Sequence, residues 1–233
     1  QVADSLHALA WLYQIQGRYQ KAEPLFEEAL AIREQVLGSQ HPQTADSLHA
    51  LAQLYQDQGK YEEAESCLER TLEIKQVLGP QHPQVADSLH ALAWLYQKQG
   101  RYEEAEALYQ RALAIREQAP EPEHPQITET LRAMGQLYQK QGRYEEAEAL
   151  YLRALAIHER APEPEHPRTD EMLYTKGLLC QVQGRYEEAE TLYQQALDIV
   201  KQQLGPGHPT AVTVRESYDD LVGDMKQKGK EQH

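Results

Sequence analysis

The chain has 233 residues, and its 37 aspartates and glutamates outnumber its 23 lysines and arginines, which gives a formal net charge of -14. An acidic chain without a basic run repels phosphate backbones and anionic lipid surfaces, so we expect neither nucleic acid nor membrane as a partner. The longest apolar stretches, 8–13 and 91–96, are far shorter than the roughly 18 residues that a membrane span needs. No signal peptide is expected at Gln1. Two isolated cysteines, Cys67 and Cys180, favour a reducing, cytoplasmic location.

One sequence unit repeats five times along the chain. Its first marker is a Gln-Gly-[Arg/Lys]-Tyr block, and its second is a His-Pro pair. The glycines of the first marker are spaced 42, 41, 42 and 42 residues apart: Gly17, Gly59, Gly100, Gly142 and Gly184. The units therefore span 1–42, 43–83, 84–125, 126–167 and 168–209. A fixed period of this length is typical of an array of stacked repeats.

Each unit is predicted to form two amphipathic helices joined at the Gln-Gly turn. Apolar residues recur at steps of three and four, first at Leu6, Leu9, Ala10 and Tyr13, and in the second half of the third unit at 105, 108, 109, 112 and 115. Glycine closes the first helix, and the proline of the His-Pro pair opens the next one. After the fifth unit we expect a capping helix at 210–225 and a disordered tail at 226–233. The fold class is therefore all-α, an α-solenoid.

Signatures of catalysis and of metal binding are absent from the sequence. There is no phosphate-binding Gly-rich loop, no Gly-x-Ser-x-Gly turn and no His-Glu-x-x-His helix. The Glu-Glu-Ala-Glu blocks are interpreted as charges that suit a helix N-terminus and keep the chain soluble. The histidines of the His-Pro pairs are predicted to make hydrogen bonds between loop and helix. We therefore expect no enzyme, no cofactor and no bound metal.

The run at 89–113, Leu-His-Ala-Leu-Ala-Trp-Leu-Tyr-x-x-Gln-Gly-Arg-Tyr-Glu-Glu-Ala-Glu-Ala-Leu-Tyr-x-Arg-Ala-Leu, resembles a tetratricopeptide repeat (TPR). The long unit with its His-Pro end is similar to the version found in the kinesin light chain and in bacterial TPR arrays. The resemblance implies a right-handed solenoid whose first helices line a concave ligand groove. By this resemblance the groove residues are Asp4, His7, Trp11, Gln14, Asp46, His49, Gln53, Gln56, Asp87, His90, Trp94, Gln97, Glu129, Arg132, Gln136, Gln139, Glu171, Tyr174 and Gln181.

The character of these groove residues suggests which ligand they bind. Trp11 and Trp94 lie outside the apolar stripe, and exposed tryptophans are enriched in binding hot spots; the alternative is that their rings pack over neighbouring side chains. Related arrays use asparagine to hold a peptide backbone, but this chain has no asparagine and carries a row of acids instead. A basic or aromatic ligand segment is therefore expected. Protonation of His7, His49 and His90 would weaken its binding.

The sequence thus predicts a non-enzymatic module that binds a protein or peptide, as the sensor or adaptor part of a larger bacterial protein. The alternative is a structural scaffold that acts through self-association of the array. The fold is specified far better than the partner.

Overall fold

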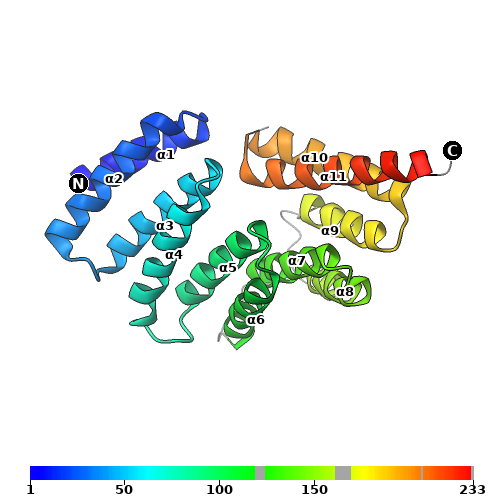
Figure 1. The fold of residues 1–233 in the computed structure, drawn as a ribbon, viewed down its shortest axis with the longest axis horizontal. Coiled ribbons are helices and arrows are strands. Elements are labelled where there is room, and N and C mark those ends of the chain that lie inside the picture. The colour runs from blue at the N-terminus through cyan, green and yellow to red at the C-terminus, as the bar shows by residue number, and fades with distance from the viewer. Residues whose placement is uncertain (119–123, 161–168, 206, 232–233) are drawn as a thin grey trace. The chain divides into compact units, whose positions relative to one another are not determined.

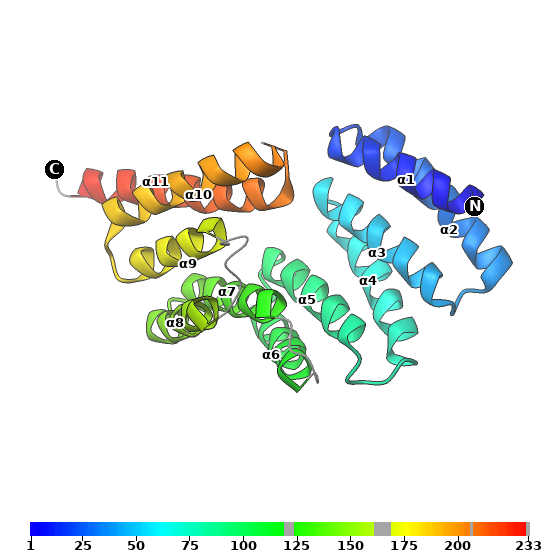
Figure 2. The ribbon, with the colours of Figure 1, turned by 180° about the vertical axis from the view of Figure 1, so that it is seen from behind.

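The structure is a computed structural model, and it describes residues 1–118, 124–160, 169–205 and 207–231. These residues form α-helices, turns and short connections without a strand, as expected for an all-α fold (Figures 1 and 2). The helices are α1 (Val2–Ile15), α2 (Tyr19–Leu37), α3 (Pro42–Asp57), α4 (Tyr61–Gln76), α5 (Pro83–Lys98), α6 (Tyr102–Gln118), α7 (His124–Lys140), α8 (Tyr144–Arg160), α9 (Thr169–Val182), α10 (Tyr186–Leu204) and α11 (Pro209–Glu231). No helix in the described part of the chain combines the length and the apolar character needed to cross a membrane.

The helices form hairpins that are grouped into two compact units. Unit 1 is Gln1–Pro122 and holds the hairpins α1–α2, α3–α4 and α5–α6; unit 2 is Glu123–His233 and holds α7–α8, α9–α10 and the single helix α11. Within a unit, the second helix of each hairpin also packs against the first helix of the next, as α4 does against α5. Each hairpin thus buries an apolar face that it could not bury alone.

The two sequence markers act as the local signals that end and begin helices. At the turn between α3 and α4, Gly59 adopts φ 73°, and the backbone N–H of Lys60 donates to the carbonyl of Tyr55 at 2.8 Å. Only glycine takes this left-handed conformation without strain. The His-Pro prediction is confirmed at His41, His82 and His208, where the ring Nδ1 accepts a hydrogen bond from the backbone N–H two residues later. The histidine of the 166–167 pair lies outside the described residues.

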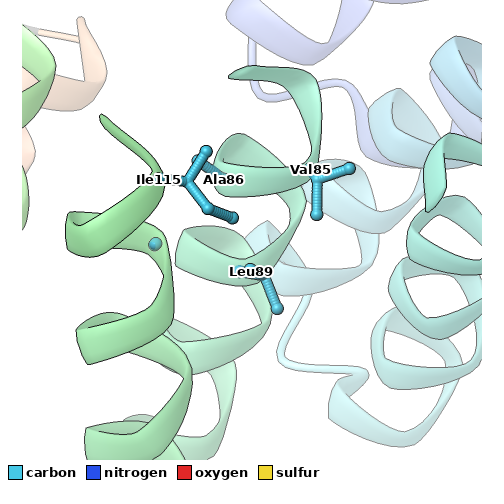
Figure 3. Packing of buried hydrophobic residues seen from close by; sticks show 5 residues of the cluster. Val85, Ala86, Leu89 and Ile115 are labelled. Atoms are coloured by element: carbon cyan, nitrogen blue, oxygen red, sulfur yellow. The ribbon is translucent and has the colours of Figure 1, made fainter. Parts of the chain in front are cut away.

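The core consists of small residues at the helix contacts and larger side chains between them. In the third hairpin, Ala86 of α5 faces Ile115 of α6, with Leu89 one turn further along α5 (Figure 3). In unit 2, glycine replaces alanine at the contact within each hairpin, and a Cβ atom at Gly135 would overlap the buried ring of Tyr151. The small residues therefore set the distance at which paired helices pack.

The last helix is longer than the sequence predicted. It was expected to end at 225 and to be followed by a disordered tail, but α11 continues to Glu231. The added residues are mostly lysine, glutamine and glutamate, which favour helix even without an apolar stripe. Its N-terminal part packs against α10 and buries Ala211, Val214 and Leu221.

Candidate functional site

The predicted ligand residues of unit 1 occupy equivalent positions on its three first helices, and we call them the first-helix face: Asp4, His7, Trp11, Gln14, Asp46, His49, Gln53, Gln56, Asp87, His90, Trp94 and Gln97. The most exposed aromatic side chain among them is Trp11, at 58%. Trp94 is half-buried, and the ammonium of Lys98 lies 5.1 Å from the centre of its ring. The two tryptophans thus have different surroundings, although the sequences that flank them are nearly identical.

Each aspartate of this face is paired with a cation from the end of the second helix in the same hairpin. Asp4 accepts from Arg33 at 2.8 Å, Asp87 accepts from Arg116 at 2.8 Å, and the Lys75 ammonium lies 3.6 Å from Asp46. The cation side chains are only 6–11% exposed, whereas the carboxylates are 41–64% exposed. Sequence reasoning missed these cations. The sequence does contain a signal for these pairs, because in each of the three hairpins of unit 1 the cation follows the aspartate by 29 residues.

The histidines of the face are half-buried rather than open. The ring of His7 packs edge-on against Phe26 with 5.1 Å between centroids, and His90 does the same against Tyr109 at 5.2 Å. Burial and the nearby Arg33 lower the pKa of His7, and burial and Lys75 lower the pKa of His49. Both rings therefore favour the neutral form at neutral pH.

The glutamines were expected to face a ligand, and the structure corrects this for several of them. The hydroxyl groups of Tyr109, Tyr151 and Tyr193 donate to the side-chain oxygens of Gln97, Gln139 and Gln181, at 3.1, 3.2 and 2.7 Å. Gln97 and Gln181 are buried as a result. Gln14 donates to Asp57 at 2.7 Å, and Gln56 is half-buried, so Gln53 is the exposed glutamine of the face in unit 1. The sequence signal for this burial was a tyrosine 12 residues after each of these three glutamines.

In unit 2 the residues predicted to line the groove contact one another. Gln136 donates to the Tyr174 hydroxyl at 2.6 Å, and that hydroxyl lies 2.9 Å from Ser217 of α11. Arg132 lies 3.6 Å from Glu171 and 5.7 Å from the centre of the Tyr174 ring. Tyr174 is therefore buried, contrary to its expected exposure, while Glu129 is exposed. The physical reason is that α11 extends this face as a further first helix.

The first-helix face offers the exposed ring of Trp11, exposed carboxylates and the exposed amide of Gln53. Side chains of these kinds can contact a bound ligand. Within the described residues, no group of three or more histidines, cysteines, aspartates or glutamates is placed to hold a metal ion. Cys67 and Cys180 are free thiols, and burial raises the pKa of Cys67 to about 11.

Comparisons with known proteins agree with this architecture. Residues 1–76, 52–118, 95–160, 126–202 and 168–218 match the tetratricopeptide repeat family. A Podosopora anserina protein, described as a kinesin light chain with nearly identical TPR-like repeats, has a crystal structure that shares 33% identity. The match covers 86% of this chain and 96% of that one with a TM-score of 0.67. A search of curated proteins gave no match.

Two further solved structures are similar. BtubC (BKLC) from P. vanneervenii shares 26% identity over 88% of this chain and 82% of that one, with a TM-score of 0.68. NprR in complex with its cognate peptide NprX shares the fold at 19% identity, over 94% of this chain and 64% of that one, with a TM-score of 0.67. The helix hairpins, the repeat markers and the family match lead to one conclusion: the chain belongs to the tetratricopeptide repeat family.

Proposed function

We propose that the chain is a non-enzymatic adaptor module that binds a peptide or protein segment on the first-helix face of unit 1. The observation that carries the proposal is Trp11, which is 58% exposed and lies on the same face as the exposed Asp4 and Gln53. An exposed tryptophan among polar side chains is the kind of residue that dominates binding energy. NprR, which shares the fold, is described with a bound peptide.

The charges of the face favour a ligand with basic and aromatic or aliphatic groups. A ligand on this surface would meet the carboxylate oxygens of Asp4, Asp46 and Asp87, because the paired cations lie beneath them and are nearly buried. Pairing leaves these carboxylates partly neutralised, so they select a donor group by geometry more than by long-range attraction. Trp11 supplies an apolar surface for an aromatic or aliphatic anchor.

Selection from a displayed library of random peptides tests this proposal. The selected peptides should combine lysine or arginine with an aromatic residue, and their binding should fall by about 30-fold or more in the Trp11→Ala variant. An exposed glutamine of α6 provides the matched control, because Gln110→Ala should bind the same peptides normally. Selection of acidic peptides, or equal binding to the Trp11→Ala variant, would refute the proposed site.

A further inference from the structure

The second hairpin of unit 1 holds a nearly buried cation that donates no hydrogen bond. Lys75 of α4 is 8% exposed, and its ammonium lies 3.6 Å from the carboxylate of Asp46, which is beyond hydrogen-bond distance. Among the residues that the structure describes, neither side chain has a hydrogen-bond partner. An ammonium group can donate several hydrogen bonds, and a buried donor that makes none costs free energy. We call Lys75 and Asp46 the open pair, since both can still bind a further group.

The equivalent pairs of the neighbouring hairpins are closed by arginine. Arg33 donates to Asp4 at 2.8 Å, and Arg116 donates to Asp87 at 2.8 Å. Arg33 also donates to the Ser47 hydroxyl of the next hairpin at 2.6 Å. A guanidinium presents its donors in a planar fork, whereas an ammonium is a compact point charge on a flexible stem. The missing hydrogen bonds of the second hairpin therefore follow from its lysine.

The open pair lies inside unit 1, with a hairpin on each side. The helix α3 packs against α2, and α4 packs against α5. Its missing hydrogen bonds are therefore not those of a hairpin that lacks a neighbour. Asp46 is 57% exposed on the first-helix face, so its carboxylate is open to a ligand there. Lys75 lies beneath it and is nearly buried, so a bound group would meet an ammonium that is already in place.

A second polar group of the same hairpin also lacks its partner. In the third hairpin, the hydroxyl of Tyr109 donates to Gln97 at 3.1 Å. The second hairpin has Leu68 where the third has Tyr109, and the side-chain nitrogen of Gln56 is buried without a hydrogen-bond partner among the described residues. Buried polar groups are hydrogen-bonded in most native structures. The second hairpin is therefore less fully bonded than the third at two equivalent places.

The charges of the open pair determine which group fits it. A carboxylate on Lys75 would be repelled by Asp46, and an ammonium on Asp46 would be repelled by Lys75. A neutral group with one acceptor and one donor side by side satisfies both side chains. A primary carboxamide, the side-chain group of asparagine and glutamine, has this arrangement, since its oxygen and its nitrogen are attached to one carbon. Hydrogen bonds to charged partners are also stronger than those between neutral groups.

We propose that Lys75 and Asp46 bind the primary carboxamide of an asparagine or glutamine side chain in the ligand. The Lys75 ammonium donates to the carboxamide oxygen, and the Asp46 carboxylate accepts from the carboxamide nitrogen. This inference rests on the proposed function, because it places one residue of the peptide on the first-helix face. It adds Lys75 as a specificity determinant from a second helix, outside the residues predicted from sequence to line the groove.

The probe that tests this site is N-acetyl-asparagine methylamide, a small compound that carries the carboxamide. Nuclear magnetic resonance follows the titration through the ring signals of His49, because burial and the nearby charge of Lys75 lower the pKa of that ring. We expect saturable shifts with a dissociation constant in the millimolar range, as for other ligands of this size. The matched alanine and aspartate compounds should bind at least about 10-fold more weakly, because the first lacks the carboxamide and the second brings a carboxylate to Asp46.

Substitutions at position 75 separate hydrogen bonding from charge. Lys75→Arg keeps the charge but should close the pair, as arginine does in the neighbouring hairpins, so binding should fall by about 10-fold. Lys75→Met removes the donor and should lower binding at least as much. Arg111→Met is the matched control, because it removes one charge from an exposed position of α6 and should leave binding unchanged. Thermal melts verify that each variant is folded.

The inference is overturned if the asparagine compound binds no better than the alanine compound, or if the Lys75→Arg variant binds it equally. Absence of any shift at millimolar concentration would assign the open pair to water alone and reject the inference. The peptides selected from the library give a separate check: dependence on Trp11 without dependence on Lys75 would reject the carboxamide site and leave the proposed function intact. Failure to select any peptide, with the asparagine compound still bound, would reject the peptide ligand alone.

Discussion

The buried cation of the second hairpin gives a prediction about which half of an ion pair stabilises the fold. Lys75 is 8% exposed and lies 3.6 Å from Asp46, which is 57% exposed. Removing the carboxylate leaves a nearly buried ammonium uncompensated, which costs 3–5 kcal/mol in a fully buried pair. Because Asp46 is partly solvated, we expect Asp46→Asn to lower the free energy of unfolding by about 1–3 kcal/mol. Lys75→Met keeps the packed stem and removes the charge, so it should cost less than about 1 kcal/mol.

Urea unfolding measures both variants, and amide exchange in α3 and α4 shows whether the loss is local. A cost for Lys75→Met equal to or greater than that for Asp46→Asn would refute this reasoning. His49 supplies an independent readout, because burial and Lys75 both lower its pKa and Asp46 raises it. In an NMR titration, Lys75→Met should raise the pKa of His49, and Asp46→Asn should lower it further.

Other variants test separate parts of the molecule. Trp11→Ala should leave the melting temperature nearly unchanged, since surface substitutions usually cost under about 0.5 kcal/mol, while Trp94→Ala should lower it; equal losses would contradict their different burial. Acidification from pH 7.5 to 5.5 should destabilise unit 1, because the pKa of His7 is lowered by folding and the unfolded chain binds the proton more readily. A His7→Gln variant should show a smaller pH effect in thermal melts. Gly135→Ala should be destabilising by calorimetry, because the overlap with Tyr151 costs about 1–3 kcal/mol and exceeds the roughly 1 kcal/mol gained in helix propensity.

The helices could be predicted from sequence because their ends are marked by local chemistry. A glycine such as Gly59 is needed where the backbone adopts a positive φ, and His41 caps α3 through a contact two residues away. Both effects act within one turn, so their spacing alone indicates the hairpins. The end of α11 was missed because residues 226–231 have no apolar period, although they favour helix.

The candidate site could be predicted only in part, because the exposure of a side chain depends on its neighbours, some in the same helix and some in other helices. Trp11 and Trp94 have nearly identical flanking sequences, yet one is exposed and the other half-buried. Residues 1–19 and 84–102 differ at one place, where α1 has Ile15 and α5 has Lys98. The Lys98 ammonium lies over the ring of Trp94. Tyr174 shows the same limit in unit 2, since it is buried and its hydroxyl lies 2.9 Å from that of Ser217, 43 residues further along the chain.

Charged side chains also join successive hairpins of unit 1. The hairpin α3–α4 presents Lys60 to the hairpin before it and Glu65 to the hairpin after it. Its two sides are therefore complementary to each other, but neither is complementary to itself. A two-fold pairing of identical sides would bring together surfaces that each lack the needed partner.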